Sequence, residues 1–416
     1  MITLSPSSPL WELLGRPSGF GAPERTATHA QGTRVLFADG HWRLCATSGL
    51  WNANLGYGNR RIADAVGKAL IDHSYLSLFR SAHTPAINAA RALLGVCGEE
   101  HYAQVLFTTS GGSANDAAMK LARQYWALQR QFRRRVVVGL HGSYHGLTYG
   151  SHGLTGESLA QSYYSVDQRW IRHVGHQDAG QLTELLATEG ESVAAIVVEP
   201  VLGTGAYPLS QQMVADLLRL RREHGFLLVA DEVATGFGRT GPYFASQEWP
   251  ESPDILLASK GLTNGTCAAA AVVVSAGVQS VFARADAQLV HAETQAGSPS
   301  TCAAIVTSIE EVQRLDALQN GKRVSAGLDS VLGSITNHPL VRSSGGTGCF
   351  RSIRLHTSDE VTPTAVVDSI RRAGALVSPG PGCVQLAPAL VYGPDDLEEL
   401  ERALWDGLNR TAEESS

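Results

Sequence analysis

The sequence contains no uninterrupted apolar run long enough to cross a membrane, no closely paired cysteines and no surplus of positive charge. We therefore expect neither a membrane nor a nucleic acid as partner, since 33 basic residues face 39 acidic ones. The short basic run from Arg130 to Arg135 is expected to be a solvated loop after a helix. The N-terminus has no basic region followed by an apolar block, which favours a cytoplasmic protein.

The six cysteines lack the CxxC spacing that is typical of a zinc site, so we expect free thiols in a reducing compartment and no metal centre. They are Cys45, Cys97, Cys267, Cys302, Cys349 and Cys383.

Short apolar runs alternate with helix-length amphipathic segments through the middle of the 416-residue chain. This pattern predicts an α/β domain, residues 49–305, in which helices cover a mainly parallel sheet, because the runs are apolar on both faces. The two ends of the chain, 1–48 and 306–416, lack this rhythm and are expected to form one smaller α/β domain. The expected strands are 104–109, 135–140, 192–200, 226–232 and 254–259, and the expected helices are 113–130 and 211–225.

Lys260 directly follows the apolar run 254–259 and precedes a small-residue stretch that we expect to be a loop. A buried ammonium is costly unless it is paired, deprotonated or used in a covalent bond. A salt bridge is the ordinary explanation for such a lysine. The alternative is an amine whose pKa is lowered by burial, which is a nucleophile toward aldehydes.

Three more groups stand at the ends of other predicted strands. The turn from Ser110 to Gly112 precedes a helix expected to begin near Ser113, and it suits either a phosphate or an ordinary serine cap. Asp231 closes the run 226–232 and can hold a protonated nitrogen or cap a helix. Tyr144 can stack on a planar ring or belong to the core.

One ligand accounts for all of these groups. A phosphate cradle, an aromatic face, an acid for a ring nitrogen and an amine for an aldehyde are what pyridoxal 5'-phosphate requires from a protein. The sequence therefore predicts this cofactor.

Six motifs, in order, resemble the class III aminotransferases, which are pyridoxal-phosphate enzymes of fold type I. The motifs are SGGSAN, YHG, VVEP, DEVATGFGRTG, SKGL and HAETQAGSPSTCAA. The resemblance covers nearly the whole chain. It implies a fold type I transferase, a homodimer with shared active sites, and transfer of an amino group from a donor to a carbonyl acceptor.

The resemblance also implies roles for single residues. Lys260 is implied to form the Schiff base with the cofactor and then to move the substrate proton, while Asp231 pairs with the pyridinium nitrogen. Thr294 is implied to reach the phosphate held by the partner subunit. The implied cofactor-binding residues are Ser110, Gly111, Gly112, Tyr144, His145, Glu199, Asp231, Val233, Lys260 and Thr294.

The sequence departs from the family where relatives bind carboxylates. Thr204 replaces a glutamate that partners an arginine in many relatives, and Gln385 replaces the arginine that grips the α-carboxylate of the substrate. Ser378 stands where diaminopelargonate-type relatives carry an arginine. Because an arginine–carboxylate fork is the strong way to hold an amino acid, we expect at least one substrate without a nearby carboxylate. The candidate substitutes are Arg43, Arg80 and Arg351.

The segment from Leu50 through Trp51 to Asn52 is expected to line the substrate pocket, together with Thr204, Ser378 and Gln385. The stretches CATSGLWNANLGYG and SKGLTNGTCAAAAVVVS further resemble aminotransferases of daptide-type peptide natural-product clusters. Those relatives aminate a ketone at the C-terminus of a ribosomal peptide. This resemblance implies a small amino donor and a peptide-borne acceptor.

Three alternatives stay open at this point. The first is an omega-amine or diaminopelargonate-like aminotransferase of small molecules. The second is a decarboxylase or aminomutase of the same fold. The third is a degenerate scaffold homologue, which the presence of both Lys260 and Asp231 disfavours.

Overall fold

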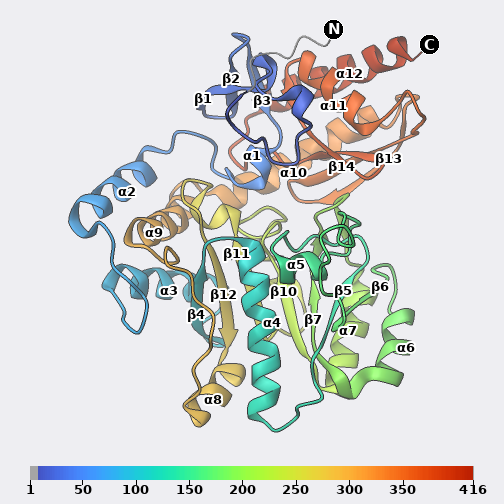
Figure 1. The fold of residues 1–416 in the computed structure, drawn as a ribbon. Coiled ribbons are helices and arrows are strands. Elements are labelled where there is room, and N and C mark those ends of the chain that lie inside the picture. The colour runs from blue at the N-terminus through green and yellow to red at the C-terminus, as the bar shows by residue number, and fades with distance from the viewer. Residues whose placement is uncertain (1–7, 416) are drawn as a thin grey trace.

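The computed structural model describes residues 8–415 and is built around a seven-stranded sheet (Figure 1). Six of its strands are parallel to one another and β12 is antiparallel to both of its neighbours. In sheet order the strands are β4 (Tyr102–Thr108), β12 (Ala270–Ser275), β11 (Ile255–Ser259), β10 (Leu227–Asp231), β7 (Val193–Val198), β5 (Val136–Leu140) and β6 (Ile171–Val174).

Helices cover both faces of this sheet. On one face of the sheet, Ile255 and Leu257 of β11 pack against α4 and α8. On the other face, Leu256 and Ala258 pack against α3 and α9, and α6 and α7 cover β5, β7 and β10. The predicted α/β architecture with a mainly parallel sheet is therefore confirmed. These helices are α3 (Thr84–Cys97), α4 (Gly111–Leu128), α6 (Gly180–Glu189), α7 (Gln211–His224), α8 (Ala276–Ala285) and α9 (Pro299–Arg314).

The predicted strands and helices are present, with ends shifted by one or two residues. The expectation of a loop after Lys260 was wrong for residues 270–275, which form β12. This stretch is buried on both faces between β4 and β11. Val272, Val273 and Val274 have a high preference for strands, and burial between β4 and β11 holds the two alanines before them in the same strand.

The two ends of the chain meet in further sheets at the top of Figure 1. Leu44 of β3 lies opposite Ala375 of β15, so an N-terminal strand pairs with a C-terminal one. This pairing supports one smaller domain made from both ends, while the boundary at residue 305 stays a prediction because it falls inside α9. These strands are β1 (Ala27–Gln31), β2 (Arg34–Phe37), β3 (Trp42–Cys45), β13 (Val341–Thr347), β14 (Phe350–Leu355), β15 (Ala375–Leu376), β16 (Ser378–Gly380) and β17 (Cys383–Leu386).

The remaining helices surround these sheets or connect them to the large one. They are α1 (Ser48–Trp51), α2 (Arg60–His73), α5 (Tyr149–Leu154), α10 (Ala317–Ile335), α11 (Pro363–Arg372) and α12 (Pro394–Glu414). Within residues 8–415, no helix is long and apolar enough to cross a bilayer.

The parallel strands place five predicted residues at one edge of the large sheet. Ser110 follows β4, Tyr144 follows β5, Glu199 follows β7, Asp231 ends β10 and Lys260 follows β11. Open α/β sheets bind ligands at the carboxyl ends of their strands, so this edge is where a site is expected.

Candidate active site

A cavity of about 1250 Å³ opens at this edge of the sheet. It brings together residues that are far apart in the sequence, and it includes all of the predicted site residues except Thr294. Those in its wall are Leu50, Trp51, Asn52, Ser110, Gly111, Gly112, Tyr144, His145, Glu199, Thr204, Asp231, Val233, Lys260, Ser378 and Gln385. The role of Thr294 toward a partner subunit stays a prediction.

Lys260 projects into the cavity from the end of β11. The side chain is half-buried, and its exposed part faces the cavity rather than the outer surface. Burial lowers the pKa of the Lys260 amine to about 8, against the opposing pull of the Glu199 and Asp231 carboxylates. Its Nζ lies 4.5 Å from the centre of the Trp51 ring. The amine is therefore partly neutral near physiological pH, as a nucleophile requires.

Asp231 is a buried anion held by three donors. The side chain is 2% exposed, and its Oδ2 accepts hydrogen bonds from Nδ1 of His145 at 2.7 Å and from Nδ2 of Asn115 at 2.8 Å. Its Oδ1 accepts the backbone N–H of Val233 at 3.1 Å. Burial raises the pKa of Asp231, but these hydrogen bonds and the His145 charge lower it overall.

Asn115 is a supporting residue that the sequence reasoning missed. It lies four residues after Gly111 on α4, and its Nδ2 also donates to the backbone oxygen of Gly111 at 3.1 Å. A buried polar residue one helical turn after a glycine-rich turn is the signal that can identify it.

The turn from Ser110 to Gly112 is both a helix cap and a candidate anion site. Helix α4 begins at Gly111, two residues earlier than expected, and Ser110 Oγ accepts the N–H of Ser113 at 3.2 Å. A Cβ added at Gly146 would lie 2.6 Å from Cα of Gly112, so the turn is closely packed from behind. Because Ser110 and both glycines line the cavity, the free N–H groups at the start of α4 are available to a phosphate.

Glu199 supports two parts of the cavity wall. The side chain is 3% exposed, and it accepts the backbone N–H groups of Tyr144 at 2.9 Å and of Gly203 at 3.0 Å. Burial raises the pKa of Glu199 to about 7. Its contacts fix the turn that carries Tyr144, whose ring stacking remains a prediction.

The side chains of Gln385 and Thr204 both donate hydrogen bonds to backbone oxygens in the cavity wall. Nε2 of Gln385, which is buried on β17, donates to the carbonyl oxygen of Gly203. The Thr204 hydroxyl donates to the carbonyl oxygen of Gly142. Ser378 lies directly opposite Gln385 in the β16–β17 pair. All three residues line the cavity, and none of them is charged, so the two positions where the resemblance predicts an arginine, 378 and 385, carry neutral side chains.

The described lining of the cavity contains no arginine. Arg43 is paired with Asp39 at 2.5 Å and Arg351 with Asp329 at 2.8 Å, and neither they nor Arg80 reach the wall. The three candidate substitutes therefore do not supply a carboxylate anchor within this chain.

Trp51 enters the cavity from a left-handed turn. Backbone φ is positive at four consecutive residues, +46° at Ser48, +56° at Gly49, +64° at Leu50 and +66° at Trp51. This conformation is unfavourable for residues other than glycine. The Trp51 ring packs on Phe350 at 5.0 Å between centroids. Such local strain is concentrated at functional sites.

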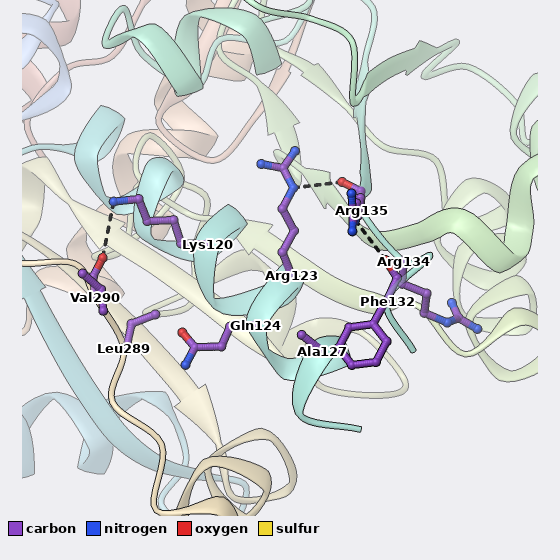
Figure 2. Close-up of a pocket in the computed structure, with 9 residues that line it drawn as sticks. All are labelled: Lys120, Arg123, Gln124, Ala127, Phe132, Arg134, Arg135, Leu289 and Val290. Atoms are coloured by element: carbon purple, nitrogen blue, oxygen red, sulfur yellow. Dashed lines mark hydrogen bonds between the residues drawn. The ribbon is translucent and has the colours of Figure 1, made fainter. Parts of the chain in front are cut away.

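A second pocket, of about 460 Å³, lies along the far half of α4 (Figure 2). Its cations already donate to backbone carbonyls, as Arg123 does to Arg135 at 2.9 Å. Arg134 is half-buried, stacks on Trp126 at 4.3 Å and donates to two backbone oxygens, so the expectation of a solvated basic loop was wrong for this residue. The lining residues are Lys120, Arg123, Gln124, Ala127, Phe132, Arg134, Arg135, Leu289 and Val290.

Comparison with known proteins agrees with this geometry. Residues 20–407 match the family model described as Aminotransferase class-III. The putrescine–pyruvate aminotransferase of Pseudomonas aeruginosa is 28% identical, with 93% of this chain and 91% of that protein covered. The acetylornithine aminotransferase of Mycolicibacterium smegmatis is 30% identical, with 97% and 98% covered.

A solved structure shows the same fold with the cofactor in place. An amine transaminase from an uncultivated Pseudomonas species, in its pyridoxal-phosphate-bound form, superposes with a TM-score of 0.89 at 26% identity. The match covers 97% of this chain and 99% of that one. The chain therefore belongs to the class-III aminotransferase family and is an enzyme that uses pyridoxal 5'-phosphate.

Proposed function

We propose that this aminotransferase moves an amino group from a small donor, an amino acid or amine, to a ketone or aldehyde without an adjacent carboxylate. The observation that carries the proposal is the described cavity wall, which contains no arginine and has Gln385 and Ser378 at the expected anchor positions. Without an arginine, the described wall offers no bidentate partner for a substrate carboxylate, which would lose its hydration without full compensation.

The residues of the cavity fit the cofactor. When bound, pyridoxal phosphate supplies an aldehyde and an electron-withdrawing ring. The anionic Asp231 suits a protonated ring nitrogen, and the start of α4 suits the phosphate. Lys260 has the lowered pKa needed to bond the aldehyde and then to move a proton at the substrate carbon.

The names of two relatives include an amine, putrescine, and an aldehyde, vanillin, and the first also names pyruvate, an acceptor that carries a carboxylate. Besides the putrescine–pyruvate enzyme, a vanillin aminotransferase of Capsicum frutescens is 28% identical over 92% of this chain. Amines and aldehydes of this kind are consistent with the omega-amine alternative. The peptide-borne ketone is a narrower proposal within the same class, supported by the sequence resemblance and by a wide cavity.

Two further parts of the proposal concern assembly and compartment. We propose a homodimer, because Thr294 lies outside the cavity of its own chain and is implied to act in that of its partner. The six free cysteines, five of them buried, are compatible with a reducing, cytoplasmic environment.

Mass spectrometry of acceptor mixtures tests the proposal. The enzyme is incubated with an amino donor and, in separate reactions, a ketone-terminated peptide, a small uncharged ketone and 2-oxoglutarate. We expect amination of an uncharged ketone, and the peptide arm decides between the two acceptor sizes. Amination of 2-oxoglutarate alone would overturn the proposal.

A further inference from the structure

A carboxylate outside the cavity, that of Glu293, accepts several hydrogen bonds from the turn that leads into α4. The Glu293 carboxylate accepts the backbone N–H of Thr109 at 3.3 and 3.2 Å, together with the hydroxyls of Thr109 and Ser113. Thr109 lines the cavity, whereas Glu293 and Ser113 do not. Glu293 therefore holds the phosphate turn, residues 109–112, from its outer side.

Glu293 belongs to the connection between α8 and α9, far from Thr109 in the sequence. The next residue, Thr294, is the one predicted to reach the partner's phosphate, and its carbonyl oxygen accepts a hydrogen bond from the Tyr75 hydroxyl at 2.8 Å. The segment that contains Glu293 and Thr294 thus contacts the phosphate turn of its own subunit and also carries the residue that is predicted to reach the phosphate bound by the partner subunit.

The Glu293 carboxylate depends on the turn for its hydrogen bonds. The nearby Nε2 of His291 lies 3.9 Å from it, but burial lowers the pKa of His291, which makes this ring a poor cation at neutral pH. Glu293 also brings a carboxylate to the start of α4, where it accepts the Ser113 hydroxyl and where the helix dipole favours a negative charge.

We propose that Glu293 is a positioning residue that keeps the phosphate turn in the shape that binds the cofactor phosphate. The inference deepens the proposed site and rests on the cofactor, not on the identity of the acceptor. Preorganisation of the turn strengthens phosphate binding. A carboxylate that only repelled the phosphate would weaken phosphate binding. Loss of the Glu293 charge should therefore lower the phosphate affinity if Glu293 positions the turn, and raise it if Glu293 only repels the phosphate.

The affinities of the apoenzyme for pyridoxal phosphate and for pyridoxal, which has no phosphate, separate these roles. We expect Glu293→Gln to weaken binding of pyridoxal phosphate about tenfold, as loss of hydrogen bonds to a charged group implies, and to leave pyridoxal binding unchanged. Asp286→Asn is the matched control, because Asp286 is an exposed carboxylate in the same connection, and we expect it to change neither affinity.

Three results would overturn the proposal. Equal weakening for both ligands would indicate a general structural role, a rise in phosphate affinity would indicate competition, and no change would indicate no role. A cycle with Ser113→Ala provides a second test, since residues in one hydrogen-bond network are not additive. In the double variant Ser113→Ala/Glu293→Ala, we expect the affinity for pyridoxal phosphate to fall by a smaller factor than the product of the factors for the two single variants. If the wild-type enzyme aminates no ketone, these affinities still decide the role of Glu293.

Discussion

The Lys260 side chain can carry a positive charge, although it directly follows a buried apolar strand. Burial lowers the pKa of its amine and so favours the neutral form. A salt bridge was the ordinary expectation for this lysine. The structure instead places the amine against the Trp51 ring, with the carboxylates of Glu199 and Asp231 acting on it only through their charge.

The pKa of about 8 predicts the pH dependence of covalent cofactor attachment. The neutral amine is the reactive form, so the attachment rate should rise with pH and reach half its maximum near pH 8. Stopped-flow absorbance after mixing apoenzyme with pyridoxal phosphate measures this rate. A midpoint near the ordinary lysine value of 10.5 would contradict the lowered pKa, and Lys260→Ala should show no attachment.

Asp231 should matter more for turnover than for cofactor affinity. If Asp231 pairs with the ring nitrogen of the cofactor as proposed, Asp231→Ala would remove that anionic partner and make the ring a weaker electron sink, while the proposed phosphate site at the start of α4 would be unchanged. We expect kcat to fall at least about a hundredfold and cofactor affinity to fall less than about tenfold, since electrostatic terms of this kind dominate catalysis. Parallel kinetics and cofactor titration measure both, and equal losses would argue against this role.

Sequence reasoning identified the residues that end strands but missed their supports. Lys260 and Asp231 stand out because a charge follows an apolar run. Asn115 has only its place one helical turn after the glycines as a local signal and Glu293 has none, because Asp231 and Thr109 are brought near them only by the fold. For the same reason, the bond between Gln385 and Gly203 could not be predicted from spacing.

The left-handed turn at Ser48–Trp51 has positive φ at four consecutive residues, a conformation that could not be predicted from the sequence. Only Gly49 in it is a residue that accepts positive φ at no cost. Leu50 is 62% exposed, so its side chain contributes little packing to offset the strain.

Substitutions at Leu50 should follow backbone preference rather than hydrophobicity. Leu50→Gly should retain stability within about 1 kcal/mol, because relief of the strain offsets the added freedom of the unfolded chain. Leu50→Val should be less stable than Leu50→Gly by roughly 2 kcal/mol, since a β-branched residue tolerates positive φ poorly. Urea unfolding of both variants measures the order, and a Val variant more stable than the Gly variant would contradict the account.

Strands were predicted best where they are apolar throughout. The run Ile255–Ser259 is buried at every position, and its residues serve both faces of the sheet. β12 was missed although Val272, Val273 and Val274 favour a strand, because the small residues that precede them suggested a loop; its neighbours in the sheet are β4 and β11.

Across the whole molecule, Arg239 joins the large sheet region to the C-terminal part of the chain. The side chain is fully buried, and its guanidinium donates to the carbonyl oxygens of Cys349 and Pro388 and to the side-chain oxygen of Asn54. Burial lowers its pKa to about 10. These contacts tie together three segments that are far apart in the sequence.

Loss of Arg239 should destabilise the protein strongly. Arg239→Met leaves several buried acceptors without a donor, which should cost about 3 kcal/mol or more. Arg60→Met is the control, because the Arg60–Asp64 pair is exposed and should contribute less than about 1 kcal/mol. Chemical unfolding compares the two variants, and similar small losses would show that the buried guanidinium is not a structural link.

We propose that the acceptor has no adjacent carboxylate because the wall of the cavity, within residues 8–415, has no arginine to hold one. The most direct measurement compares kcat/KM for an uncharged ketone and for 2-oxoglutarate, in the wild-type enzyme and in Gln385→Arg, with one amino donor. We expect the wild type to prefer the uncharged ketone and Gln385→Arg to shift the ratio toward 2-oxoglutarate by about tenfold or more, the effect of one arginine–carboxylate contact. A wild-type preference for 2-oxoglutarate would contradict it.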